Sequence, residues 1–175
     1  MKRIVILLLI VALAVASATA ESAAFSFRGT AWGMTAQEVR DAEKGKPDAD
    51  TEAGFDVLEY EDVTLYGFEC DIDYWLRDDA LRAVTCEYDT EDTKADFESI
   101  QAAVQADFGE PIEPDTERWM LMKDILDGEF GERRVDNYVC WQLADDTLVT
   151  LVEDAEDESI ELGFFDELKL VEAML

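Results

Sequence analysis

Histidine is absent from the 175-residue chain, and basic residues are scarce, with 14 Lys and Arg against 43 Asp and Glu. Without an imidazole the chain cannot build a Ser-His or Cys-His catalytic pair, an imidazole proton shuttle or a zinc site with a histidine ligand. The formal net charge of -29 at pH 7 excludes ordinary nucleic-acid binding, which needs Lys and Arg to displace counterions from phosphates. The hydrophobic content of 49% nevertheless predicts a packed core.

Motifs for cofactors and covalent catalysis are also missing. The sequence has no glycine-rich phosphate loop and no Gly-x-Ser-x-Gly elbow, so we expect no cofactor. None of its acidic clusters fits the twelve-residue calcium loop, so no specific metal site is predicted, and a divalent-cation binding protein is an alternative. With 43 acids, some pair always meets the separation that a glycosidase needs. A carboxylate-dependent extracellular hydrolase is therefore a further alternative to a non-enzymatic protein.

The first twenty residues have the three parts of a secretory signal peptide. Lys2 and Arg3 precede an apolar run over residues 4–15, and Ala18-Thr19-Ala20 supplies a small-residue cleavage pattern. The run is short for a membrane span, no basic cluster follows it, and no cysteine near the exit could carry a lipid. We expect cleavage after Ala20, a secreted or extracytoplasmic protein without a lipid anchor, and no stable membrane insertion after cleavage.

A helix is predicted near the start of the mature chain, after a short alternating strand over residues 25–28. Thr35 and Glu38 have the spacing of a capping box, in which each side chain meets the other residue's backbone amide. Gly45, with a proline two residues later, predicts the helix end. The preceding Trp32-Gly33-Met34 predicts a structural turn with a buried indole, rather than a ligand site.

A second helix with the same end signal is predicted from Thr93. Its apolar residues follow one another at spacings of 3, 4 and 4, and Gly109-Glu110-Pro111 closes it. These apolar residues are Phe97, Ile100, Val104 and Phe108.

Strand-like segments follow each predicted helix. They cover residues 55–60, 63–76 and 81–88 after the first helix, and 135–143, 148–153 and 160–165 after the second. A helix plus an antiparallel meander, occurring twice, predicts an α+β domain with helices packed on one face of an antiparallel sheet. The predicted organisation is a signal peptide, 1–20, followed by two related halves of one compact domain, 21–90 and 91–175. Residues 166–175 are expected to be helical, whereas residues 112–134 give no clear prediction.

Residues 27–39 resemble the opening of a loose group of exported bacterial proteins of unknown function, which share a Trp-Gly-Met-Ser/Thr turn followed by a Glu-Val helix. The helix end at residues 107–111 and the strand around Trp141 resemble later parts of the same group. The helix-then-meander unit is also similar to the fold of beta-lactamase inhibitory proteins and of the small lipoproteins of outer-membrane assembly. Both of these bind other proteins, so the resemblance implies an interaction module at the level of the fold. It carries over no functional residue, because no motif specific to either family is present.

The run over residues 70–77 alternates, and its polar side is the candidate binding site. We expect Cys70, Ile72, Tyr74 and Leu76 on one face, and Asp71, Asp73, Trp75 and Arg77 on the other. An aromatic side chain among charges suits protein recognition, because Trp and Arg are common anchors of binding energy. The prediction is a non-enzymatic, inhibitor-like module whose partner is another extracytoplasmic protein with a basic surface. Arg82 would join the site if the strand register put it on the same face, and the alternative is that a loop or helix covers Trp75.

The redox state of the 3 cysteines stays open in an exported chain. Cys70 and Cys86 lie at equal distances from the turn predicted near Asp78, on the apolar sides of their strands, so they could form a disulfide. Disulfides between adjacent strands are uncommon, and buried free thiols are the alternative.

Overall fold

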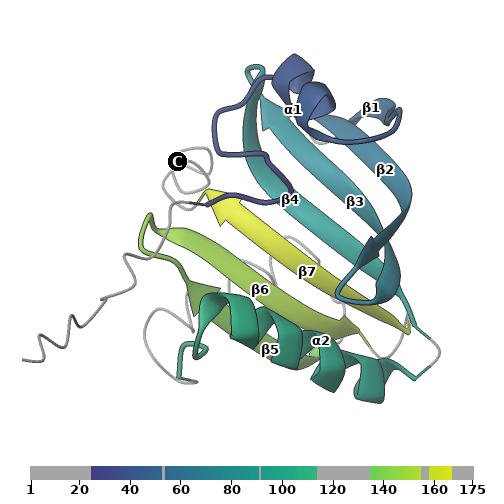
Figure 1. The fold of residues 1–175 in the computed structure, drawn as a ribbon, viewed down its shortest axis with the longest axis vertical. Coiled ribbons are helices and arrows are strands. Elements are labelled where there is room, and N and C mark those ends of the chain that lie inside the picture. The colour runs from purple at the N-terminus through teal and green to yellow at the C-terminus, as the bar shows by residue number, and fades with distance from the viewer. Residues whose placement is uncertain (1–24, 53, 91, 114–134, 155–157, 167–175) are drawn as a thin grey trace, which may run out of the picture.

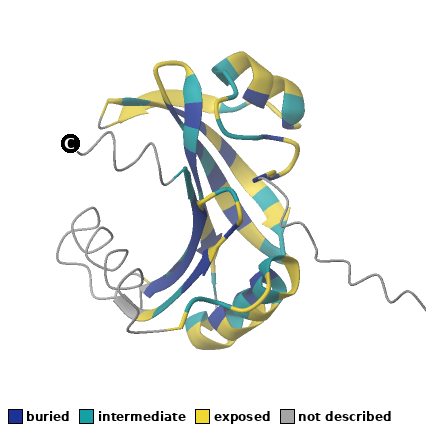
Figure 2. Cartoon of the chain, turned by 90° about the vertical axis from the view of Figure 1, so that its left-hand side faces the viewer, coloured by how far each residue is buried: buried dark blue, intermediate teal, exposed yellow. Residues whose placement is uncertain are grey.

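The computed structural model describes residues 25–52, 54–90, 92–113, 135–154 and 158–166. Along the chain the elements are α1 (Ala36–Ala42), β1 (Asp48–Glu52), β2 (Phe55–Leu65), β3 (Phe68–Arg77), β4 (Ala80–Asp89), α2 (Thr93–Phe108), β5 (Val135–Gln142), β6 (Thr147–Asp154) and β7 (Ser159–Asp166). The strands form one antiparallel sheet in the order β1-β2-β3-β4-β7-β6-β5, and α1 and α2 lie on the same side of it (Figures 1 and 2). The predicted α+β class is confirmed.

The core lies between the helices and one face of the sheet. The strand alternation predicted for residues 70–77 is observed, because Cys70, Ile72, Tyr74 and Leu76 of β3 are all buried on the helix side. The two helices bury Val39, Phe97, Ile100 and Val104 in the same apolar cluster. Removal of this apolar surface from water is the main stabilisation of such a fold.

The helix boundaries follow their capping signals, with one correction. Thr35 and Glu38 form the predicted capping box of α1, and Gly109, at a φ of 86°, is the C-cap of α2. The prediction that α1 ends near Gly45 is wrong, because the helix stops at Ala42. Glu43 is already extended, and its side chain turns into the core rather than along the helix surface.

The break predicted between residues 60 and 63 is a β-bulge inside a continuous β2. Asp62 takes up the bulge with a φ of 55°, and its amide donates to the Asp71 carboxylate at 3.0 Å. The actual turn between β2 and β3 falls at Tyr66-Gly67, inside the segment predicted as one strand. β1 was not predicted.

The strand predicted over residues 25–28 is reduced to a single bridge between Phe27 and Thr30. The following turn has the predicted structural role. The Trp32 indole stacks on Phe25 with ring centroids 3.8 Å apart and donates to the Thr147 hydroxyl at 2.7 Å. Together these contacts attach the amino-terminal segment to the helix side of the sheet.

Two predictions fall outside the described residues. They are the signal peptide and the helix over residues 166–175, of which Asp166 alone is described, as the last residue of β7. The stretch over residues 112–134, for which the sequence gives no clear prediction, is described only at residues 112 and 113. Within the described ranges, no helix is long and apolar enough to cross a membrane.

Candidate functional site

The four predicted site residues share the sheet face that points away from α1 and α2. Asp71 and Arg77 are exposed there, and Asp73 and Trp75 are half-buried. Because both helices pack on the opposite face, neither of them covers Trp75. We call this face, with its row of aromatic side chains and its carboxylates, the outer face.

Arg82 does not join the outer face. The register shifts between the Trp75 and Leu76 pairs, so that Trp75 faces Ala83 while Leu76 faces Leu81. Arg82 lies within this irregularity, and its guanidinium pairs with the Asp166 carboxylate at 3.2 Å. The bulge turns the Arg82 side chain away from the outer face. Its position could not be predicted from the alternation of β3 alone.

The cysteines are free and buried, so the Cys70–Cys86 disulfide does not form in this structure. Cys70 faces Tyr88 and Cys86 faces Ile72, which makes the two cysteines diagonal rather than direct neighbours. The predicted symmetry about Asp78 fails for two reasons: the turn is centred between Asp78 and Asp79, and the irregularity in this strand pair shifts the register by one further residue. Burial raises the pKa of Cys70 to about 12, so its thiol holds very little of the reactive thiolate at neutral pH.

Trp75 is the centre of an aromatic row across the outer face. Its indole N–H donates to the Thr85 hydroxyl at 2.9 Å, and its ring meets Phe55 nearly edge-on, with centroids 6.2 Å apart. The Arg77 guanidinium lies 5.4 Å from the Phe55 ring centroid, within the range of a cation–π contact. These contacts hold the indole in one orientation while leaving part of it exposed.

The row continues onto β7 through Phe165. Phe165 is half-buried and directly faces Ala83, the residue that also faces Trp75. Its ring lies across Gly163, where an added Cβ would come within 2.5 Å of the ring and 2.8 Å of the Thr150 hydroxyl. A side chain at position 163 would therefore displace Phe165, so this glycine is what lets the ring lie flat on the face.

Beside the aromatic row the outer face is acidic. The strand registers place carboxylates on it from β1 to β7, among them Asp48, Asp50, Glu52, Glu59, Glu69, Asp71, Asp73, Glu87, Asp89 and Glu161. Several are direct cross-strand partners, including Glu59 with Asp73 and Asp71 with Glu87. Arg77 and Arg82 are the basic residues of the described strands, and Arg82 is paired elsewhere. Like charges facing one another destabilise a sheet, so the fold retains this arrangement at a cost.

Asp73 is the most perturbed carboxyl group of this face. Its pKa is raised to about 6, mainly by burial and then by the negative charges of Glu59, Asp71, Glu87 and Glu52. The pKa of Glu59 is raised for the same reasons, burial first. The outer face therefore loses negative charge in mildly acidic solution, well above the usual range of an aspartate.

Asp73→Asn should stabilise the protein at neutral pH. Because the folded pKa of Asp73 exceeds its unfolded value of about 4, the native state binds the extra proton, and the free energy of unfolding falls as pH rises from about 4 to 6. Asparagine does not ionise, so the variant avoids this fall in the free energy of unfolding. We expect a gain of about 1 kcal/mol at pH 7.5, after allowing for solvent screening, and little change at pH 4.

Urea unfolding of both proteins across this pH range measures the difference. Asp41→Asn, which removes an exposed carboxylate on α1, away from the outer face, is the matched control and should unfold like the wild type. Equal profiles for the wild type and Asp73→Asn would show that the outer face does not perturb this carboxyl.

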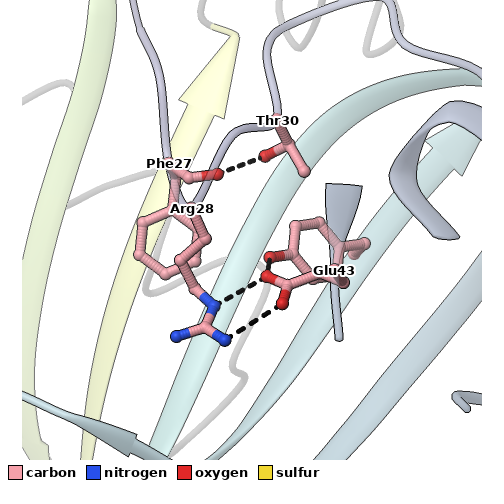
Figure 3. Close-up of polar contacts among 5 residues, drawn as sticks. Phe27, Arg28, Thr30 and Glu43 are labelled. Carbon is pink, nitrogen blue, oxygen red and sulfur yellow. Dashed lines mark hydrogen bonds and ion pairs between the residues drawn. The ribbon is translucent and has the colours of Figure 1, made fainter. Parts of the chain in front are cut away.

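A second polar cluster lies in the core, on the helix side of the sheet. Arg28 donates two hydrogen bonds to the Glu43 carboxylate, at 2.7 and 3.0 Å, and the Tyr74 hydroxyl donates to the same carboxylate (Figure 3). Glu43 is 7% exposed. The bonds to Glu43 are the largest cause of the raised pKa of Arg28, and burial raises that of Tyr74. Since the carboxylate is enclosed by its partners, this cluster is a structural clamp between the amino-terminal segment, α1 and β3.

Sequence reasoning missed most of the outer face. Asp48-Ala49-Asp50-Thr51-Glu52 alternates acidic and small residues, which is a strand period, but it lacks the β-branched and aromatic residues that mark strands. Phe55 and Phe165 lie at the margins of predicted strands, and nothing local shows that Phe55 contacts Trp75 or that Phe165 shares its face. In the part of the chain that the structure describes, no three or more acidic or cysteine side chains come together in a group that could hold a metal ion. No protein-family model, curated protein or solved structure matches this chain.

Proposed function

We propose that this protein is a non-enzymatic binding module that acts outside the cytoplasm and binds a partner protein with a basic surface. The observation that carries the proposal is the outer face, where a half-exposed Trp75 lies in an aromatic row beside many carboxylates. An aromatic anchor with a charged surround is typical of binding hot spots. The acidic field would speed the encounter with a basic partner and make the association depend on salt.

The proposed location rests on the sequence alone. A basic start, an apolar run and Ala18-Thr19-Ala20 favour export and cleavage before Glu21. Mass spectrometry of the secreted protein tests this, since a retained leader would contradict it.

We also infer that the domain consists of two related halves. In the first half α1 is followed by the four-stranded meander β1-β2-β3-β4, and in the second α2 is followed by the three-stranded meander β5-β6-β7. The two meanders adjoin through their last strands, β4 and β7 (Figure 1). This arrangement supports the repeat and the resemblance to inhibitory proteins drawn from the sequence. Superposition of the two halves in an experimental structure tests it, and strands that do not correspond would refute it.

Charge reversal on the outer face tests the proposed function. We expect Asp71→Lys with Glu87→Lys to weaken capture of a partner from the extracytoplasmic fraction by at least about tenfold at low salt, because both carboxylates lie in the proposed docking field. Asp41→Lys with Glu98→Lys, both exposed and on the helices, changes the net charge by the same amount and should have little effect. Equal losses for the two variants would show that net charge alone governs binding.

A carboxylate-dependent hydrolase is the second candidate, and the raised pKa of Asp73 beside Glu59 favours it, because a general acid needs a carboxyl that stays protonated near its working pH. Hydrolysis of a panel of glycosides, abolished by Asp73→Asn, would support this candidate. The binding proposal predicts no turnover by either protein.

A further inference from the structure

β1 is an open edge of the sheet, and its carboxylates lie at the margin of the outer face, where Glu52 faces Phe55. It pairs with β2 along its whole length, and among the described residues no strand or loop hydrogen bonds to its other side. All five of its residues are exposed. Figure 1 shows β1 at the margin of the sheet, below the end of α1.

Ala49 and Thr51 present the backbone groups of this edge that point away from β2. The hairpin closes on the pair Glu52 and Phe55, and pairs alternate between hydrogen-bonded and non-hydrogen-bonded in an antiparallel ladder. The backbone N–H and C=O groups therefore point toward β2 at Asp48, Asp50 and Glu52. At Ala49 and Thr51 they point outward, away from the sheet. In agreement, the Thr51 amide donates to the Asp50 carboxylate at 2.7 Å, a local acceptor where a neighbouring strand would supply a carbonyl.

The two sides of the edge differ in chemistry. Asp48 and Asp50 lie on the outer face, because they are in register with Glu59 and Val57, and Glu52 follows them by alternation. On the other side β1 offers only the small side chains of Ala49 and Thr51. A strand lying alongside would place every second side chain against the carboxylates, and opposite charges in directly facing positions stabilise a sheet.

The charge of the edge also decides what can pair with it. A second copy of this chain, joined edge to edge, would bring the carboxylates of the two β1 strands against one another, and like charges there are destabilising. An extended segment with alternating Lys or Arg has the complementary pattern. Backbone hydrogen bonds to an exposed edge give affinity, and the alternate side chains give specificity.

We propose that the open edge of β1 binds an extended basic segment of a partner protein as an additional antiparallel or parallel strand, with alternate Lys or Arg side chains facing Asp48, Asp50 and Glu52. The bound segment bonds through its backbone to the outward groups of Ala49 and Thr51. This site does not depend on Trp75 and could be occupied whether or not the aromatic row binds a partner.

Fluorescence anisotropy with the labelled peptide Lys-Thr-Lys-Val-Lys-Thr-Lys tests the proposal on the full mature chain at about 0.15 M salt. The comparison probe has the same sequence and charge but carries N-methyl groups at alternate residues, which blocks backbone pairing. We expect the methylated peptide to bind at least about tenfold more weakly, because the lost backbone bonds leave only the electrostatic attraction. Equal affinities, or no binding of the unmethylated peptide, would overturn the proposal.

Two substitutions of Thr51 test the same backbone pairing by changing the protein instead of the peptide. Thr51→Pro removes the outward amide but no carboxylate, and proline is tolerated at an edge where its missing N–H faces solvent. It should reduce peptide affinity about as much as N-methylation does, whereas Thr51→Val keeps the amide and should bind like the wild type. Trp75→Ala should leave peptide affinity unchanged, so failure of this site and failure of the outer face give different results. Unchanged binding by a folded Thr51→Pro would contradict the edge site.

Discussion

Arg28→Met should lower the free energy of unfolding by about 3 kcal/mol, because it leaves a buried carboxylate without its cation. Glu43 receives both hydrogen bonds from Arg28 and keeps only the Tyr74 hydroxyl in the variant. The Arg28 side chain is 30% exposed, which places the loss at the lower end of the range for buried pairs. Arg28 also has a φ of 51°, but methionine bears a Cβ as arginine does, so the backbone strain is the same in both proteins.

Guanidinium unfolding at neutral pH, followed by tryptophan fluorescence, measures this loss. Arg40→Met, an exposed arginine on α1, is the matched control and should change stability by no more than about 0.5 kcal/mol. The double variant Arg28→Met with Glu43→Leu should regain most of the loss, because replacing a whole buried ion pair by apolar groups is often neutral. A double variant as unstable as the single one would show that the clamp acts through packing rather than charge.

The sequence predicts a helix boundary well where the residues that set the boundary lie within one turn of it. The Thr35 and Glu38 capping box and the Gly109 end cap act within one helical turn, so they are readable from neighbouring residues. The early stop of α1 has a distant cause, because Glu43 leaves the helix to meet Tyr74 on β3. No local pattern encodes that contact. The bulge at Asp62 appears in the sequence as a gap between two strand-like segments for a related reason, since polar residues mark bulges and strand breaks alike.

The candidate site was predictable only along its own strand. Alternation gave the shared face of Asp71, Asp73, Trp75 and Arg77, and the structure agrees. Which strands lie beside β3, and in what register, depends on pairings that one strand does not determine. The remaining carboxylates of the outer face and the ring of Phe165 therefore became visible only once the seven-stranded order was known.

Trp75→Ala should weaken binding to any partner of the outer face by about 100-fold, the effect expected of a central hot-spot aromatic. The variant loses the indole that Phe55 and Thr85 hold in place. Because Trp75 is only half-buried, its removal should cost about 1–2 kcal/mol of stability and leave the protein folded. The loss of binding would then reflect the missing side chain and not unfolding.

Trp32→Ala is the matched control, since Trp32 is also a half-buried tryptophan but stacks on Phe25 on the helix side of the sheet. The decisive measurement is the affinity of the wild type and both tryptophan variants for a partner captured by the wild type, with equal amounts of folded protein. We expect Trp75→Ala to bind about 100-fold more weakly and Trp32→Ala to bind like the wild type. If Trp75→Ala binds as tightly as the wild type, or if Trp32→Ala is the variant that loses binding, the outer face is not the docking surface.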